Sequence, residues 1–458
     1  MSAVRLRVPK QLILMRTRRP MANHQHSLCK SCPFHYDPFK KSSFESYVFK
    51  SALLWHHQIT MDVSKYRKDF PILNVEDGPT YLDSACMTLR PQVVIDAINE
   101  YYTKYPACGG RSVHKLSWQV TEGFEMARDS LRRLMGAEKT SEIVFTKNAT
   151  EGMNMVANGL GLGKGDKVLT SDKEHNSNVV PWHHLAKYKG INYQVVPAKD
   201  NYFFDLEALK EMIDSNTKLV SFVHTSNLDG NTNPAKDIIE ICHDKGVKVM
   251  MDTAQSAPHK ELNVVDLDVD FAAASAHKFC GPSGMGLLYG KYDELKELIP
   301  TYVGGSTVVS SSYEGYELLP PPSCFEAGLQ DYAGAIGAGA AAEYVMGVGR
   351  DNISKHENKL NVQLTKELEG LDGLSIVGPD VSQRGGICSF NLEGWDPTDV
   401  AMHLDEKYNV AIRSGMHCVH SWFNSRGIDG TARASIYFYN NEQDVTAFTD
   451  AIKDTLSG

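Results

Sequence analysis

The sequence predicts an α/β protein in which a mainly parallel sheet is followed by a smaller α+β region. From Glu142 onward, short apolar runs alternate with stretches of helical pattern, an order typical of crossover units in parallel sheets. Around residues 318–322 this alternation stops. The 458 residues are 42% hydrophobic and 22% charged, which excludes a disordered, collagen-like or coiled-coil protein and allows two domains with their own cores.

Seven short apolar runs are expected to form the strands of the larger sheet. They are residues 143–146, 167–170, 193–197, 219–223, 247–252, 271–275 and 286–289. A parallel sheet binds its ligand at the carboxyl ends of its strands. The residues that follow these runs are therefore the first candidates for a functional site.

The region beyond the proline-rich stretch is expected to form the smaller domain. Its predicted elements are a Gly/Ala-rich helix over 333–347, an amphipathic helix near 356–368, a strand over 387–392, a helix near 397–407, a strand over 410–413 and a closing helix after Asn441. We predict a large domain over residues 76–322. The small domain combines residues 61–75 with 323–458.

Residues 1–60 differ from the rest in charge. They hold ten Lys and Arg against two acidic residues, a net charge of +8, whereas residues 61–458 carry −17. We interpret 1–60 as a basic leader, either disordered or the product of a mis-set start before Met61, with a targeting segment and a functional module as the alternatives. The acidic body argues against nucleic acid as a partner. No apolar window reaches the roughly 20 residues of a membrane span.

The nine cysteines are scattered and do not form the spacing of a disulfide framework, which favours a cytoplasmic location. Cys29 and Cys32, with His24, His26 and His35 nearby, suggest a metal or redox site. A structural zinc site needs four ligands, usually from a second pair, and no second pair follows before residue 61. We therefore predict no metal site.

Lys278 and Asp252 carry the strongest chemical signal. Lys278 closes the run Ser-Ala-His-Lys after an apolar strand, and a lysine buried there has its pKa lowered, as Schiff-base chemistry requires. Asp252 ends a very apolar strand, where it could hold a protonated pyridine nitrogen. Taken singly, such an Asp can be a helix cap and such a Lys can be solvated. Their order and spacing together favour the chemical interpretation.

Residues 252–255 and 275–278 resemble the signature of class V aminotransferase-type enzymes, which use pyridoxal 5′-phosphate (PLP). The resemblance extends from about Met61 to the C-terminus and implies PLP fold type I, a seven-stranded large domain with a small α+β domain, assembled as a homodimer. Further motifs follow in the family's order. They are Tyr81-Leu-Asp-Ser-Ala85, Arg111-Ser-Val-His114, Asn148-Ala-Thr-Glu151, Glu174-His175 with Asn178, and Ser226-Asn227.

This resemblance implies a role for each cofactor-binding residue. The phosphate would be held by Ala149 and Thr150 at a helix start, with Ser275 and His277 as further donors. His175 would stack on the ring, Asn227 and Gln255 would bind its phenolic oxygen, and Asp252 its nitrogen. Lys278 would bind PLP covalently and then move the Cα proton of the substrate.

The segment Arg413-Ser-Gly-Met-His-Cys418, followed by Arg433, resembles cysteine desulfurases of the Suf type and the related selenocysteine lyases. A free cysteine is otherwise often a buried core residue. The resemblance implies that L-cysteine is converted to L-alanine, with a persulfide on Cys418 that passes to a sulfur-acceptor protein of iron–sulfur assembly or another thiolation pathway. His175 would assist proton transfer. The implied substrate-binding residues are Arg433, Asn227, Arg413 and Ala85.

The sequence departs from the family pattern in three places. Leu329 and Gln330 stand where the family has Thr-Pro and where the Thr reaches the phosphate of the neighbouring subunit; Gln330 could substitute for it. Asn176 replaces a frequent His, and Asn148 replaces a small residue. Two alternatives within enzymes are a selenocysteine lyase and another class V enzyme, such as an aminotransferase or epimerase. A third is a weakened, non-catalytic scaffold for sulfur assembly, suggested by Leu329.

Overall fold

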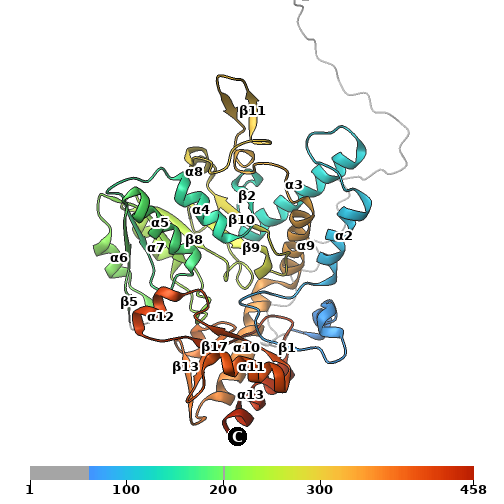
Figure 1. Cartoon of the computed structure of the whole chain (residues 1–458), viewed down its shortest axis with the longest axis vertical. Coiled ribbons are helices and arrows are strands. Elements are labelled where there is room, and N and C mark those ends of the chain that lie inside the picture. The colour runs from blue at the N-terminus through green and yellow to red at the C-terminus, as the bar shows by residue number, and fades with distance from the viewer. Residues whose placement is uncertain (1–60, 200–201, 458) are drawn as a thin grey trace, which may run out of the picture. The chain divides into compact units, whose positions relative to one another are not determined.

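A seven-stranded sheet forms the centre of the larger part of the computed structural model, which describes residues 61–199 and 202–457 (Figure 1). Its strand order is β2-β10-β9-β8-β7-β3-β4, and β10 alone runs antiparallel to its neighbours. The strands are β2 (Ile143–Thr146), β3 (Lys167–Thr170), β4 (Asn192–Val195), β7 (Thr217–Val223), β8 (Lys248–Asp252), β9 (Phe271–Ser275) and β10 (Gly286–Gly290). The predicted, mainly parallel sheet is confirmed, with strand ends within two residues of the expected ones.

Both faces of this sheet are buried, because successive strand residues enter two different cores. Met250 of β8 belongs to one hydrophobic cluster and Met251 to the other. The first contains residues of α4 (Ala149–Gly159), α5 (Val180–Lys189) and α8 (Tyr292–Glu297). The second contains residues of α3 (Lys115–Met135), α6 (Leu206–Met212), α7 (Ala235–His243) and α9 (Tyr332–Val348). This two-sided burial explains why the strands appear in the sequence as uninterrupted apolar runs.

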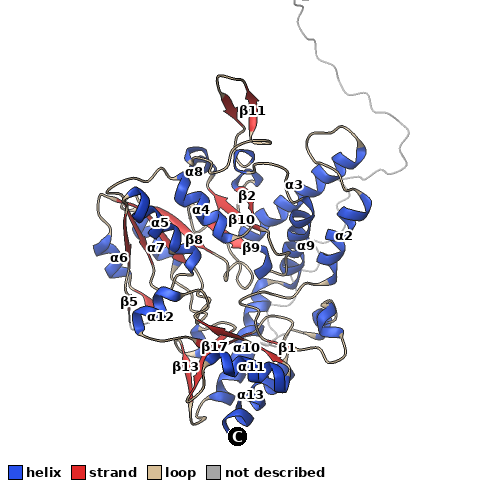
Figure 2. Cartoon of the chain, in the orientation of Figure 1, coloured by secondary structure: helices blue, strands red, loops and turns tan. Residues whose placement is uncertain are grey.

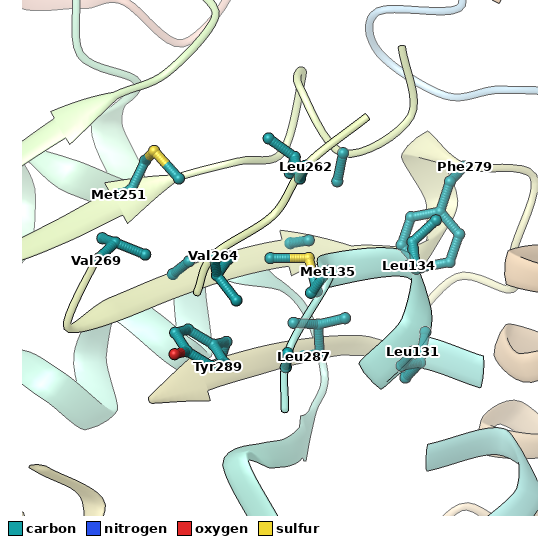
Figure 3. Close-up of a cluster of buried hydrophobic side chains, with 14 of the residues drawn as sticks. Leu131, Leu134, Met135, Met251, Leu262, Val264, Val269, Phe279, Leu287 and Tyr289 are labelled. Carbon is teal, nitrogen blue, oxygen red and sulfur yellow. The ribbon is translucent and has the colours of Figure 1, made fainter. Parts of the chain in front are cut away.

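The end of α3 illustrates how this core is closed (Figure 3). Leu134 and Met135 pack near Leu287 of β10 and Val264 of the loop after β8. Gly136 ends the helix with φ +67°, and a Cβ there would lie 2.7 Å from the carbonyl oxygen of Leu262. A side chain at this position would clash with the loop, so the turn at the end of α3 requires a glycine.

A second, antiparallel sheet of four strands lies in the C-terminal region (Figure 2). Its order is β13 (Leu374–Val377), β14 (Ile387–Leu392), β17 (Thr431–Ser435) and β16 (Arg413–Gly415). It shares a core with α10 (Arg350–Leu368), α11 (Pro397–Tyr408) and α13 (Glu442–Ser457). The strand predicted over 410–413 is divided into β15 (Val410–Ala411), which pairs with β1 (Thr80–Tyr81), and β16.

The Gly/Ala-rich segment forms the predicted helix α9, which packs against α2 (Gln92–Lys104) and α3. A Cβ at Gly339 would lie 2.6 Å from Cα of Ala127, so the small residues allow close helix packing. Although α9 falls in the predicted small domain, it packs on helices of the predicted large one, and the described residues form one unit. The domain boundaries therefore stay a prediction.

The first described residues pack against the C-terminal region. Phe70 forms edge-to-face contacts with Phe438 and Tyr439, and Arg67 forms an ion pair of 2.7 Å with Asp444.

The predicted leader, 1–60, lies outside the described residues. No helix in the described ranges is long and apolar enough to cross a membrane. The remaining elements are α1 (Ser64–Arg67), η1 (Pro71–Asn74), η2 (Thr140–Glu142), η3 (Asn176–Asn178), β5 (Ala198–Lys199), β6 (Phe203–Phe204), η4 (Ala276–Lys278), β11 (Val308–Ser311), β12 (Tyr316–Leu318), η5 (Ser323–Phe325), η6 (Val381–Gln383) and α12 (His420–Arg426).

A buried ion pair joins α3 to the segment after η5. Arg128 donates to both carboxylate oxygens of Glu326, at 2.6 and 3.0 Å, and the N–H of Phe145 donates to the same carboxylate. Removing Glu326 leaves the buried Arg128 with only the exposed Glu125 as an ionic partner and removes the acceptor of the Phe145 N–H, so Glu326→Ala should lower the free energy of unfolding by about 3–5 kcal/mol in urea titrations. Glu343→Ala, which breaks the exposed pair with Arg133, should cost about 0–1 kcal/mol. Equal losses in the two variants would contradict this prediction.

Candidate active site

One cavity lies where the carboxyl ends of the parallel strands meet the four-stranded sheet. All thirteen residues predicted from the sequence as catalytic, cofactor-binding or substrate-binding line it, and they come from both the large and the small sheet regions. They are Ala85, Ala149, Thr150, His175, Asn227, Asp252, Gln255, Ser275, His277, Lys278, Arg413, Cys418 and Arg433. Their individual roles stay predictions, but the fold brings them to one place.

The start of α4 forms one wall of this cavity. The side chain of Asn148 caps the helix by accepting from the N–H of Glu151 at 3.0 Å. The N–H of Ala149 donates to Oγ of Ser275 at 2.9 Å, and the hydroxyls of Thr150 and Ser177 lie 2.6 Å apart. Backbone donors at a helix start, together with several hydroxyls, suit a phosphate dianion. Asn148 therefore supports the phosphate turn as its helix cap.

Asp252 ends β8 inside the cavity. Its Oδ1 accepts from the N–H of Ala254 at 2.9 Å, and no described side chain binds its other oxygen. Burial raises the pKa of Asp252 to about 6. A buried carboxyl with a free oxygen fits a protonated ring nitrogen, which would return the carboxyl to its charged form.

Lys278 lies in η4, directly after β9, the strand that neighbours β8. Burial, followed by the positive charge of Arg433, lowers the pKa of its amine to about 8. Its Nζ donates to the carbonyl oxygen of Ala85, which also accepts from Nε2 of Gln255 at 2.7 Å. A lowered pKa makes the neutral, nucleophilic amine accessible near neutral pH. The set of residues therefore fits PLP, with an amine, an acid for the ring nitrogen and a phosphate cradle.

His175 is held in one tautomer. Its Nδ1 accepts from the N–H of Ser177 at 3.1 Å, so the proton of the neutral ring is on Nε2. Burial, followed by the charges of Lys278 and Arg413, lowers the pKa of His175 to about 4. The ring is therefore neutral at physiological pH and is a donor at Nε2.

The residue before it, Glu174, fixes this segment to the sheet. Its carboxylate accepts from the N–H of Val223 and from Nδ2 of Asn178, both at 2.7 Å. These bonds join the loop after β3 to the end of β7. They explain how a loop residue such as His175 keeps a defined position.

Two arginines enter the cavity from the small sheet. Arg413 of β16 and Arg433 of β17 are direct partners across the antiparallel pair. Arg433 is buried and donates to the carbonyl of Asn227 at 2.7 Å and to Asp83 at 3.3 Å, and its Nε has no partner among the described residues. A buried guanidinium with an unused N–H suits the carboxylate of an amino acid.

Cys418 lies in the short loop between β16 and α12 and is half-buried. Both His417 and Cys418 have positive φ, +49° and +61°, which is uncommon for residues other than glycine and is typical of functional loops. The carbonyl of Cys418 accepts from the N–H of Asn176 at 2.7 Å, and Arg426 of α12 pairs with Asp172 at 3.0 Å. The loop is thus fixed to the segment that carries His175.

The structure adds residues that sequence reasoning missed. Asp83 contacts Arg433, and Cys86 contacts Arg413; both belong to the segment after β1. The motif matched only as far as Ala85, so Cys86 was indistinguishable from a core cysteine. Leu329 is 73% exposed, and Nε2 of Gln330 donates to the carbonyl of Glu326 at 2.9 Å. Gln330 is therefore already bound within its own turn, which disfavours the substitution considered for it.

Cys29 and Cys32, which were considered as metal ligands, lie outside the described residues. Within 61–199 and 202–457, no group of three or more His, Cys, Asp or Glu is arranged to hold a metal ion. The seven cysteines in these ranges are all free thiols.

Comparison with known proteins gives consistent results. The Aminotransferase class-V family matches residues 80–448. The cysteine desulfurase of Haloferax volcanii is 38% identical over 411 residues, which are 86% of this chain and 96% of that protein. The apo structure of the cysteine desulfurase from Thermococcus onnurineus is 37% identical, with a TM-score of 0.83 over 86% of this chain and 98% of its own. A mutant of C-DES with glycine covalently linked to its PLP cofactor is 23% identical, covers 85% of this chain and 99% of its own, and has the same fold, with a TM-score of 0.74.

Proposed function

We infer the function from one premise: the chain belongs to the Aminotransferase class-V family, among its cysteine desulfurases. It is a PLP-dependent cysteine desulfurase. We propose that it converts L-cysteine to L-alanine and that the sulfur is retained as a persulfide on Cys418. PLP, when bound, withdraws electrons from the substrate and so makes its Cα proton acidic.

We propose that this chain's own residues carry out the remaining steps. Asp252 holds the ring nitrogen protonated, and the residues at the start of α4 hold the phosphate. Arg433 binds the substrate carboxylate, with Asn227 positioned by its bond to the carbonyl of His417. The neutral amine of Lys278 removes the Cα proton. Each role follows from a charge or donor that already faces the cavity.

Sulfur transfer then requires a thiol close to the bound amino acid. The thiolate of Cys418 attacks the substrate sulfur, an S–S bond forms, and the bond between Cβ and sulfur breaks with its electrons returning to the carbon. The proton released when Cys418 ionises is taken up at Cβ, so the step needs no further acid. His175, which is neutral with its proton on Nε2, assists this proton transfer on the same side, because its segment is bonded to the Cys418 carbonyl through Asn176. The single observation that carries the proposal is that Cys418 and Lys278 line one cavity.

The alternatives make different use of these residues. An aminotransferase or epimerase has no use for a thiol at residue 418. A non-catalytic scaffold would not require Asp252 and Lys278 to face one cavity. A selenocysteine lyase would retain the whole site, so only the substrate that the protein turns over distinguishes it from a cysteine desulfurase.

The decisive experiment is alanine release from L-cysteine by the PLP-loaded protein, with L-selenocysteine as the second substrate. We expect alanine from cysteine together with an equivalent amount of persulfide or sulfide. Alanine from selenocysteine alone would identify a selenocysteine lyase instead. A protein that binds PLP and releases alanine from neither substrate would support the scaffold.

We also propose the assembly and the partners. Residues 111–114, which resemble the segment that reaches the partner subunit, include the fully exposed Val113, and Leu329 is exposed as well, as a homodimer interface would require. The persulfide of Cys418 would pass to a sulfur-acceptor protein of iron–sulfur assembly. The free thiols in the described ranges favour the reducing cytoplasm.

A further inference from the structure

The catalytic cavity contains a second thiol, that of Cys86. Among the seven described cysteines, only Cys86 and Cys418 line this cavity, and both are half-buried. Cys242, Cys280, Cys324 and Cys388 are buried, and burial raises the pKa of the Cys242 and Cys280 thiols to about 12. Cys108 is half-buried but lies away from the cavity, beside Tyr332. Cys86 is therefore set apart by its position.

Cationic groups surround the sulfur of Cys86. The guanidinium of Arg413 donates directly to its Sγ, and Lys278 and Arg433 lie near enough for their charges to interact with it. The thiolate is the nucleophilic form of a cysteine, and the positive charge of these groups is opposite in sign to the charge of that form. Cys86 also follows Ala85, whose carbonyl accepts from Lys278, so its backbone is held at the reacting end of the cavity.

The connection between the two thiols is made by the small sheet. Arg413 begins β16, and the loop that carries Cys418 follows this strand directly. Arg413 therefore contacts Cys86 with its side chain while its own strand leads into the Cys418 loop. That loop has left-handed backbone at two consecutive non-glycine residues.

We propose that Cys86 is a second sulfur carrier, which receives the sulfane sulfur from the persulfide of Cys418. The inference rests on the proposed function. The thiolate of Cys86 attacks the outer sulfur of the Cys418 persulfide, an S–S bond forms to Cys86, and the bond between that sulfur and Sγ of Cys418 breaks. Cys418 leaves as a thiolate, the transferred sulfur keeps its proton, and no oxidant or reductant is needed. Cys418 is then free for a second turnover before any acceptor protein arrives.

The test is persulfide mapping on the holoenzyme. PLP-loaded protein is mixed with L-cysteine without an acceptor, quenched with iodoacetamide at successive times, digested with trypsin and analysed by mass spectrometry. Cys86, Cys108 and Cys418 fall on different tryptic peptides, since Lys104, Arg111 and Arg413 separate them. We expect sulfur on Cys418 first and on Cys86 afterwards, so that each chain carries a second sulfur atom.

Three variants distinguish the explanations. Cys86→Ala should keep bound PLP and the persulfide on Cys418 but lose the second sulfur. Cys418→Ala should lose sulfur from both positions, because the transfer to Cys86 starts at Cys418. Cys108→Ala, the control for a half-buried thiol outside the cavity, should match the parent protein.

Two results would overturn the relay while leaving the proposed function intact. One is a persulfide on Cys418 with none on Cys86 at any time. The other is full labelling of Cys86 in Cys418→Ala, which would mean that the sulfur does not come from Cys418. If neither thiol gains sulfur while the protein consumes cysteine, the relay and the persulfide mechanism of the proposed function both fail.

Discussion

Cys418→Ser is expected to bind PLP and L-cysteine but to release alanine at least about a thousandfold more slowly than the parent protein. The reason is chemical, because a hydroxyl is a far poorer acceptor of sulfur than a thiolate. The substitution is nearly isosteric and the side chain is half-buried, so the loop between β16 and α12 should keep its backbone bonds to Asn176. The measurement is alanine formed per bound PLP under substrate saturation.

Cys108→Ser is the matched control, a half-buried thiol outside the cavity, and it should keep its activity. Selenocysteine provides a second contrast. Selenium can leave without a protein thiol, so alanine release from selenocysteine should fall much less in Cys418→Ser than release from cysteine. Retention of full cysteine turnover in this variant would contradict the assignment of Cys418 as nucleophile.

The chemistry of the site could be predicted because its residues stand in local motifs. Asp252 ends one strand that is buried on both faces and Lys278 follows another, and such strands are visible in the sequence as uninterrupted apolar runs. Since these strands are parallel and neighbouring, their carboxyl ends must meet. The predicted residues therefore line one cavity, although no sequence pattern specifies their distances.

The small sheet was less predictable. Strand β17 has the sequence Thr-Ala-Arg-Ala-Ser, all buried, in which small residues and a charged one replace the usual large apolar side chains. It is a strand because it pairs with β14 and β16. Arg433 is tolerated there because the carbonyl of Asn227 and the carboxylate of Asp83 accept hydrogen bonds from its guanidinium. Tertiary contacts thus determine this element, and periodicity could not reveal it.

Cys86 shows the same limit at the site. Its importance depends on Arg413, which is 327 residues away in the sequence and reaches it only because β16 and the segment after β1 meet at the same cavity. The helices α2 and α3 were also not predicted, although they precede the sheet. Their partner is the Gly/Ala-rich helix α9, which belongs to a distant part of the sequence.

Lys278→Ala is expected to abolish both covalent attachment of PLP and alanine release. The neutral amine is required for both, and no second amine lines the cavity within the described residues. Lys278→Arg should fail equally, because it keeps the positive charge but cannot form the covalent bond. Borohydride reduction followed by mass spectrometry should place PLP on Lys278 in the parent protein and on no residue of either variant.

Lys260→Ala tests whether a lowered lysine pKa is sufficient for PLP attachment or whether the lysine must also line the catalytic cavity. Burial lowers the pKa of Lys260 as well, but its side chain lies outside the catalytic cavity, so this variant should attach PLP normally.

The pH dependence of PLP attachment to the apoprotein gives an independent check. Because the pKa of Lys278 is lowered to about 8, about half of the amine is neutral at that pH and nearly all of it about one unit higher. The rate of PLP attachment should therefore increase with pH and level off above about pH 9, whereas an ordinary lysine would continue to gain neutral amine to beyond about pH 10. A rate that still rises steeply at pH 10, or borohydride-stable PLP in Lys278→Ala, would exclude Lys278 as the attachment site.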